Sequence, residues 1–309
     1  MSTPNSWPLL PYADLKDTLA TLHLWTQMVG KVRLRKTPWI NHSWHVTLYV
    51  SPRGLTTGSM PYEQGVFSLE FDFVRHQLAL TTSTGHQASL PLADGTVADF
   101  YKQLRAMLEK ADIAADIHNR PNEMEPAVPF DEDHQDRSYQ PDHAHAVWQA
   151  LLRIHNVFTD FRADFSGKVS PVHLFWGAFD LAVTRFSGRE APKHPGGAPN
   201  IPLAVMQEAY SHEVSSAGFW PGNPDFPEAA FYAYCYPTPD TFQAQPVQPE
   251  ASYYHQELGE FILPYEAVQQ ADDPEATLMD FLRTTYEAAA NTGDWDRAAL
   301  DCDLSHLKK

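Results

Sequence analysis

The residues best placed to do chemistry lie in one apolar segment, residues 170–189. The middle of this segment is typical of a buried strand, where an unpaired charge is unfavourable. Asp180 interrupts it, so we expect its carboxylate to have either a partner or a catalytic task. The task would be that of a general base or a metal ligand. The structural alternative is a buried ion pair with Arg162, Arg185 or Arg189.

A second group of candidates follows in the segment 210–216, where His212 and Glu213 face opposite sides of a predicted strand. We predict Asp180, His212 and Glu213 as catalytic residues. His173 and His212 with one carboxylate would form a two-histidine, one-carboxylate site for a transition metal. Their spacing matches no tight ligand motif, and the alternative is that both histidines form hydrogen bonds within the core. No other cofactor is indicated.

Aromatic and basic residues nearby could bind a ligand. Trp220 belongs to an aromatic turn, and Tyr232 and Tyr234 alternate with smaller residues on one face of a strand. Arg185 and Arg189 could hold an anionic group of the ligand. The alternative for the tyrosines is packing beneath a helix, with their hydroxyl groups at its rim.

The elements that must position these residues form two similar series. The first is a helix over 13–29, strands over 46–50, 66–74, 77–82 and 88–92, and a helix over 96–109 capped by Asp94 or Thr96. The second is a helix over 142–161, strands over 172–184, 210–216, 230–236 and 253–263, and a helix over 274–291. Long Pro- or Gly-rich insertions occur only in the second series, at 188–209, 221–228 and 237–250, and we expect the site there.

Residue pairs at one fixed offset relate the two series. His23 and His155, Trp44 and Trp176, and Arg53 and Arg185 are each 132 apart (155 − 23, 176 − 44 and 185 − 53). This offset predicts an internal duplication and places Asp180 where the first series has Leu48.

The predicted fold is therefore α+β: two related α-β-β-β-β-α units with antiparallel sheet and helices packed on one face. We expect the first unit at 1–112, a surface linker rich in solvated acidic residues at 113–141, the second unit at 142–292 and a C-terminal tail at 293–309.

Composition limits the possible partners. The 309 residues are 43% hydrophobic and carry a net charge of −17, which disfavours nucleic acid and anionic membranes. Cys235 and Cys302, the two cysteines, cannot form a four-thiolate zinc site. No signal peptide or membrane span is visible, so we expect a cytoplasmic protein. Oligomeric state is left open.

Three blocks, at 41–46, 173–189 and 210–222, resemble the signature blocks of an uncharacterised bacterial family with a domain of unknown function. The resemblance covers about Trp7 to Pro239 and implies a bacterial, cytoplasmic source. It implies no activity and no catalytic residue.

Three functions compete. The first is an enzyme of unknown reaction, with its site in the second unit, that acts on a small polar or anionic molecule and could depend on a metal. The second is a non-catalytic protein that binds a small molecule, and the third is a structural or interaction module. The phosphate-binding loop, the dinucleotide glycine fingerprint and the G-x-S-x-G motif do not occur, which removes the commonest NTPase, dehydrogenase and hydrolase classes.

Overall fold

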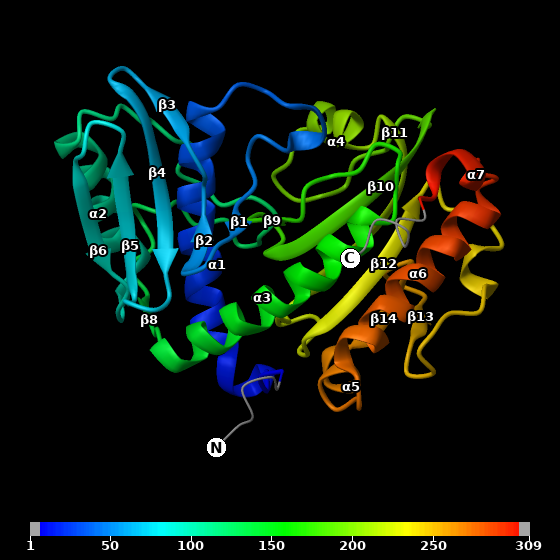
Figure 1. Cartoon of the computed structure of the whole chain (residues 1–309). Coiled ribbons are helices and arrows are strands. Elements are labelled where there is room, and N and C mark those ends of the chain that lie inside the picture. The colour runs from blue at the N-terminus through cyan, green and yellow to red at the C-terminus, as the bar shows by residue number, and fades with distance from the viewer. Residues whose placement is uncertain (1–6, 303–309) are drawn as a thin grey trace.

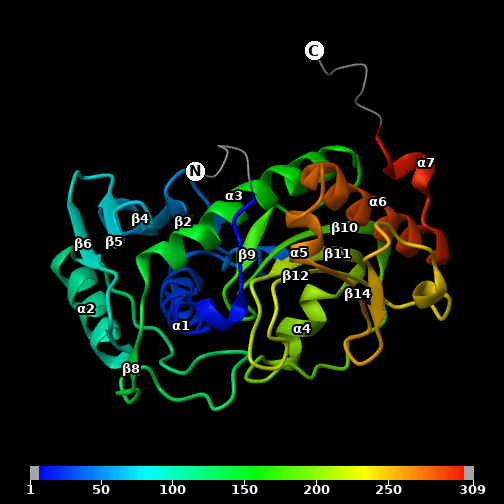
Figure 2. The same ribbon diagram turned by 90° about the horizontal axis from the view of Figure 1, so that it is seen from below.

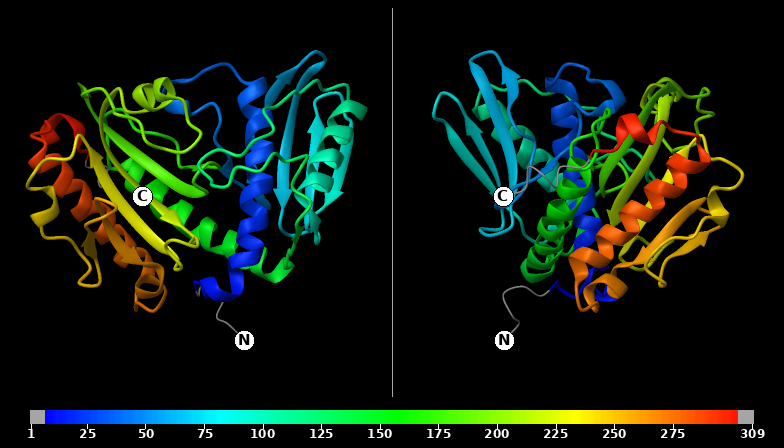
Figure 3. Two further views of the ribbon diagram at one scale, coloured as in Figure 1. Left: turned by 180° about the vertical axis from the view of Figure 1, so that it is seen from behind. Right: turned by 45° about the vertical axis from the view of Figure 1, so that its right-hand side comes forward.

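The computed structural model describes residues 7–302, and its centre is a long helix between two antiparallel sheets (Figures 1 and 3). This helix, α1 (Tyr12–Lys36), is buried on nearly all sides. Apolar side chains such as Leu22 and Met28 pack into one core that continues through both halves of the chain. Polar side chains of α1, among them Gln27 and Lys31, are buried as well. A helix enclosed in this way is typical of the interior of a larger domain.

The first sheet has the strand order β1-β2-β4-β5-β6, with β3 paired to β4. Phe67, Leu69 and Phe71 of β4 face the core, while Ser68 and Glu70 face the other side, as the period of two requires. Its strands are β1 (Tyr49–Val50), β2 (Gly54–Thr56), β3 (Met60–Tyr62), β4 (Gly65–Asp72), β5 (Gln77–Thr82) and β6 (Gln87–Pro91). The short helix η1 (Asn41–Ser43) precedes them, and helix α2 (Val97–Lys110) follows.

The second sheet has the order β13-β14-β12-β11-β10-β9. An antiparallel bridge between Leu48 and Leu174 links it to the first, with N–H···O distances of 2.9 and 2.8 Å. Its elements are β9 (His173–Phe175), β10 (Asp180–Glu190), β11 (His212–Trp220), β12 (Ala230–Tyr236), β13 (Tyr253–His255) and β14 (Glu260–Pro264).

Helices cover both faces of the second sheet (Figure 2). Helices α3 (Pro141–Ala163) and α6 (Pro274–Thr292) pack on one face, against β10 and against β11 and β12 respectively. The short helix α4 (Leu203–Ala209) lies over the other face. The expectation of helices on one face alone is therefore wrong for this unit, because the insertion at 188–209 returns as α4. The remaining elements are β7 (Gly95–Thr96), β8 (Asp136–Arg137), η2 (Phe242–Ala244), α5 (Tyr265–Gln269) and α7 (Arg297–Leu300).

The α+β class is confirmed, and so is the cap of α2, where the Thr96 hydroxyl accepts from the Asp99 N–H at 3.0 Å. The single strand expected over 172–184 is wrong, because a turn from Trp176 to Phe179 divides it into the hairpin of β9 and β10. Each of the two large sheets has six strands rather than four, and β7 and β8 form a separate two-stranded sheet.

The internal duplication is not confirmed. Both halves run helix, antiparallel sheet, helix, but the paired arginines occupy different elements. Arg53 lies in the turn between β1 and β2, whereas Arg185 lies within β10.

The predicted domain boundaries stay a prediction. Of the predicted tail, residues 293–302 pack back on the second unit, since Cys302 N–H donates to the Asp164 carbonyl at 3.1 Å. Residues 303–309 lie outside the described part. Within residues 7–302, no helix is long and apolar enough to cross a membrane.

Candidate functional site

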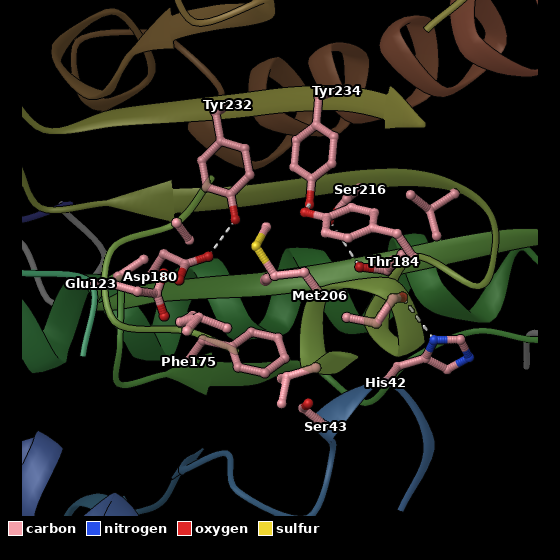
Figure 4. Close-up of a pocket in the computed structure, with 18 of the residues that line it drawn as sticks. His42, Ser43, Glu123, Phe175, Asp180, Thr184, Met206, Ser216, Tyr232 and Tyr234 are labelled. Carbon is pink, nitrogen blue, oxygen red and sulfur yellow. Dashed lines mark hydrogen bonds between the residues drawn. The ribbon is translucent and has the colours of Figure 1, made fainter. Parts of the chain in front are cut away.

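A cavity of about 300 Å³ lies between the second sheet, helix α4 and segment η1 (Figure 4). Its floor is the sheet face that α3 and α6 leave free. The residues that line it are His42, Ser43, Trp44, Glu123, Phe175, Ala178, Asp180, Ala182, Thr184, Phe186, Ala198, Ile201, Val205, Met206, Ala209, Tyr210, Val214, Ser216, Trp220, Tyr232, Tyr234 and Glu260.

Asp180 and Tyr232 form a pair across three strands. Tyr232 on β12 lies over Gly218 of β11, and its hydroxyl donates to Oδ2 of Asp180 on β10 (Figure 4). A β-carbon at residue 218 would lie 2.3 Å from the phenol ring, so only glycine leaves room for this crossing. The Trp220 ring packs beside the phenol, with ring centroids 4.8 Å apart. Both members of the pair are buried, Asp180 at 6% exposure and Tyr232 at 5%.

Three carboxyl groups share this cavity, and all have raised pKa values. Burial raises the pKa of Asp180 to about 6, against the opposing effect of the Tyr232 hydrogen bond. Burial and then the nearby Asp180 charge raise the pKa of Glu123 to about 7. The same two causes raise the pKa of Glu260 to about 8. At neutral pH, Asp180 is therefore mainly ionised and Glu260 mainly protonated.

Helix α1 holds Glu123 in place through the preceding residue. Gln27 donates to the Asn122 carbonyl at 2.7 Å and accepts from the Asn122 N–H at 2.9 Å. Lys31 donates to the Asn122 side chain, which in turn donates to the Asn200 carbonyl at 2.5 Å. Glu123 itself lies against Gly177 and has a φ of 56°. The segment 113–141 is therefore not only a surface linker, because it delivers a partly buried carboxyl group to the cavity.

Helix α1 also positions the turn before Asp180. The His23 Nε2 atom lies 2.7 Å from the Gly177 carbonyl, and the His23 ring stacks on Phe179 with centroids 5.3 Å apart. Trp176 packs on Gly30, where a β-carbon would lie 2.1 Å from the indole ring. The buried helix thus fixes both the turn and, through it, the start of β10.

Hydroxyl groups line the middle of the cavity. The Thr184 and Ser216 hydroxyls are 2.9 Å apart, and the Tyr234 hydroxyl lies 2.8 Å from that of Tyr210. These residues come from β10, β11, β12 and the end of α4, so the row crosses the floor and reaches the cover (Figure 4). Such a row can donate and accept hydrogen bonds with a polar ligand.

Segment η1 of the first unit closes the other end of the cavity. His42 N–H donates to both Glu208 carboxylate oxygens, at 3.0 and 2.9 Å, and its Nδ1 lies 2.9 Å from the Ala209 carbonyl. Its Nε2 lies 2.5 Å from Nζ of Lys168. The Ser43 hydroxyl is buried without a hydrogen-bond partner in the structure. The predicted location in the second unit alone is therefore too narrow.

Several strained backbone positions border this cavity. Positive φ is rare outside glycine and costs about 1–3 kcal/mol where a side chain must be held in it. Glu123 and Ser43 line the cavity with φ of 56° and 58°, and Phe179, with φ of 59°, directly precedes Asp180. Strain of this kind tends to concentrate at functional sites.

A comparison with protein families shows which family the chain belongs to. A family of unknown function, DUF5996, matches residues 7–302. The chain belongs to this family. A search of curated proteins found no match to the chain, and neither did a search of solved structures. The resemblance seen in the sequence is confirmed, and it extends past Pro239 to the end of the described residues.

Four of the predicted site residues meet in the cavity of this DUF5996 protein: Asp180, Trp220, Tyr232 and Tyr234. Asp180 is buried, as its apolar surroundings predict, and its partner is a phenol rather than an arginine. The tyrosines lie under α4 and its loop, but their hydroxyls point into the cavity (Figure 4).

Arg185 does not reach the cavity, because it lies on the opposite face of β10. Its guanidinium donates to the Phe161 carbonyl and lies 3.5 and 4.4 Å from the ring centroids of Phe161 and Tyr286. Burial lowers its pKa to about 10. The side chain joins α3 and α6 to the sheet instead of binding an anion.

Arg189 and Glu213 also lie outside the cavity. They form an ion pair at 2.7 Å, and Arg189 donates to the Gly293 carbonyl at the end of α6. The Arg189 side chain is 47% exposed. The pair anchors the end of a helix, and the ligand-binding role of Arg189 and the catalytic role of Glu213 stay predictions.

The predicted metal pair is not brought together. His173 pairs with Ala182 on β10, and His212 pairs with Glu190, eight residues further along the strand. Eight residues span roughly 26 Å, which is too far for one ion. Within residues 7–302, no group of three or more His, Cys, Asp or Glu side chains could hold a metal.

The two histidines therefore have other surroundings. His173 is fully buried, both ring nitrogens lack a hydrogen-bond partner, and burial lowers its pKa to about 3. His212 lies next to the cavity rather than in its lining, with its ring 5.9 Å from that of His42.

Sequence reasoning missed Glu123, Glu260 and the contribution of His42 and Ser43. A weak signal exists for Glu260, because it opens the apolar strand β14 much as Asp180 opens β10. Glu123 gives no local signal, since acidic residues are common in its segment. Its burial depends on contacts with α1, some 95 residues earlier in the chain.

Proposed function

We propose that this protein is an enzyme that acts on a small polar molecule by general acid–base catalysis in the cavity beside Asp180. The observation that carries the proposal is the set of three carboxyl groups that line one cavity and have pKa values of about 6, 7 and 8. Carboxyl groups whose surroundings separate their pKa values are the usual means by which one site supplies both a base and an acid.

Asp180 is the base in this scheme, because its carboxylate is mostly ionised at neutral pH and the Tyr232 hydroxyl fixes its orientation. Glu260 is the acid, because it keeps its proton up to about pH 8. Glu123 is poised near neutrality and could supply or accept the second proton. Positioned groups of this kind typically accelerate proton transfer by about 10²–10⁴-fold.

The substrate class follows from the cavity. A volume of about 300 Å³ suits a molecule of small-metabolite size. The walls combine aromatic and aliphatic side chains, and the polar groups are hydroxyls, carboxyls and the imidazole of His42. Arg185 and Arg189 face elsewhere, so the support is for a polar substrate rather than an anionic one.

The test combines binding and turnover in one experiment. The protein is incubated with a panel of small amines, polyols, sugars and carboxylic acids, and NMR follows both ligand binding and product formation. Asp180→Asn should stay folded and lose at least about 100-fold in turnover. Asp160→Asn, at an exposed position of α3, is the matched control. Undiminished turnover in Asp180→Asn would exclude Asp180 as the base.

The same experiment tests the alternative function, a non-catalytic binding protein. Binding in the cavity with no product from any bound compound would favour that alternative. Failure of every compound to bind would remove the cavity as a ligand site and leave a structural role for the strained loops.

A further inference from the structure

The charges that line the cavity are unbalanced. Three carboxyl groups face it, and among the described residues none of the lining side chains is Lys or Arg. The one lining side chain that could be cationic is His42, and burial lowers its pKa. Both of its ring nitrogens are already occupied, by the Ala209 carbonyl and by Lys168. The protein therefore supplies no counter-ion inside this cavity.

One carboxyl group also has an unused hydrogen-bonding position. The Oε2 atom of Glu260 is buried and has no partner in the structure. Buried polar atoms in folded proteins are nearly always paired, and an unpaired acceptor commonly marks the place of a missing ligand or water. In this cavity the unpaired Oε2 of Glu260 lies near the carboxyl groups of Asp180 and Glu123, which favour a positively charged hydrogen-bond donor.

The walls suit the same kind of ligand. Aromatic rings of Trp44, Phe175, Phe186 and Trp220 border the cavity along with the tyrosines. The faces of such rings carry negative partial charge and attract ammonium groups within about 6 Å. Lys168 already shows this behaviour at the edge of the cavity, with its Nζ 4.9 Å from the centroid of Phe186.

We infer that the ligand of this cavity is an organic ammonium ion, whose N–H donors bind the carboxyl groups of Asp180, Glu123 and Glu260 while its apolar part packs on the aromatic walls. The inference rests on the proposed function in one respect, that the cavity is the ligand site. It goes beyond that proposal by naming the charge and the chemical class of the substrate.

Binding of such a cation should release protons. The titratable groups that face the carboxyls are the phenols of Tyr210, Tyr232 and Tyr234. They stay neutral because their pKa values are raised, mainly by burial. His42 and Lys168 lie at the far end. A bound ammonium favours the ionised form of Glu123 and Glu260, both of which hold protons near neutrality. About one proton per ligand should therefore leave near pH 7.

The experiment compares three probes of nearly equal shape: 2-phenylethylammonium, 2-phenylethanol and 3-phenylpropanoate. Isothermal titration calorimetry in phosphate and in HEPES, which differ in ionisation enthalpy, measures both affinity and proton release. We expect the ammonium to bind at least about tenfold more tightly than the alcohol, and the carboxylate to bind most weakly. The affinity for the ammonium should rise between pH 6 and 8, as the two glutamates ionise.

Two variants keep the test independent of folding. Glu260→Gln and Glu123→Gln should each weaken ammonium binding and reduce proton release, with little change for the alcohol. Glu257→Gln, in the exposed turn between β13 and β14, should change neither. A purely structural role for the glutamates would affect the ammonium and the alcohol alike.

Equal affinity for the ammonium and the alcohol, tightest binding of the carboxylate, absence of proton release or absence of binding by all three probes would overturn the inference. If the alcohol or the carboxylate binds best in the cavity and a related compound is turned over, the proposed function stands and only the cation inference fails. If the ammonium binds as expected but no amine is turned over, the proposed function fails and this inference stands.

Discussion

Asp72 in the first sheet and Asp180 in the second are both buried aspartates, with exposures of 1% and 6%, yet their surroundings differ in kind. Asp72 forms an ion pair with Arg53 and accepts the N–H groups of Val74 and Arg75 at 3.0 and 2.9 Å. Asp180 accepts a hydrogen bond from the Tyr232 hydroxyl and has no cationic partner among the described residues.

The pKa values follow these surroundings. Burial acts to raise the pKa of Asp72, but the Arg53 hydrogen bond and the two N–H donors together hold it below its usual value. The pKa of Asp180 is raised to about 6. A carboxylate that stabilises the fold is thus neutralised by its partners, whereas the Asp180 carboxylate keeps a charge that the protein does not balance.

The difference extends to the two sheets. The outer face of the first sheet, with Ser68 and Glu70, has no helix over it, whereas the second sheet has α4 over its free face (Figure 2). Covering a sheet face with one short helix and loops leaves room for a cavity. In the first sheet Arg53 balances the buried Asp72, whereas among the described residues no Lys or Arg lines the cavity to balance Asp180.

Opposite effects on stability provide the strongest test of this comparison. Asp72→Asn should lower the free energy of unfolding by roughly 1–3 kcal/mol, because two backbone donors lose a charged acceptor. Asp180→Asn should raise it near pH 8 by on the order of 2 kcal/mol, because the buried charge is removed. Urea denaturation near pH 8 measures both. A similar loss of stability in both variants would contradict the distinction between the balanced Asp72 and the unbalanced Asp180.

The pH dependence of stability should separate the two kinds of carboxyl group. The folded pKa values of Asp180, Glu123 and Glu260 are raised, so their contribution is fully favourable below about pH 4 and is lost as pH rises through 6, 7 and 8. The pKa of Asp72 is lowered, so its contribution is present at neutral pH and is lost as pH falls.

Glu260→Gln should therefore flatten the decline in stability between about pH 5 and 8, by on the order of 2 kcal/mol at the upper end. Urea denaturation across this range checks it, with Glu257→Gln as the control that keeps the wild-type slope. An unchanged slope in Glu260→Gln would mean that the Glu260 carboxyl ionises normally and that, unlike Asp180, it has no raised pKa.

Gly218→Ala is the mildest test, because it moves the partner of Asp180 without touching Asp180. Its β-carbon would displace the Tyr232 ring, at about 1–2 kcal/mol in stability, and should raise the pKa of Asp180 further by removing a hydrogen bond that lowers it. NMR titration of the labelled carboxyl carbon measures the shift. Gly95→Ala meets nothing within 4 Å and should change neither quantity. A lowered pKa in Gly218→Ala would contradict the role given to Tyr232.

Local patterns predicted the parts of the fold that depend on neighbours in sequence. Alternation along residues 66–74 predicted β4, and Thr96 marked the start of α2. The turn at Trp176–Phe179 was not predicted, because its residues are as apolar as those of the strands and its form depends on packing against α1.

The site was predictable to a similar extent. Asp180 was identified because a carboxylate in an apolar strand is unfavourable unless it is paired or functional. The alternating tyrosines of β12 indicated the sheet face that lines the cavity. Arg185 was expected to bind a ligand, yet strand alternation already places it on the face opposite Asp180 and away from this cavity. Glu123 could not be found from local sequence, because only the contact of Asn122 with Gln27 and Lys31 makes its position special.

The position of α1 makes the cavity depend on both halves of the chain. The helix clamps Asn122, supports the turn before Asp180 and belongs to the half of the chain that also provides His42 and Ser43. A gene fragment that begins at α3 would encode the whole second sheet yet leave the cavity without one acid and one end wall. The cavity is therefore complete only when both halves of the chain are present.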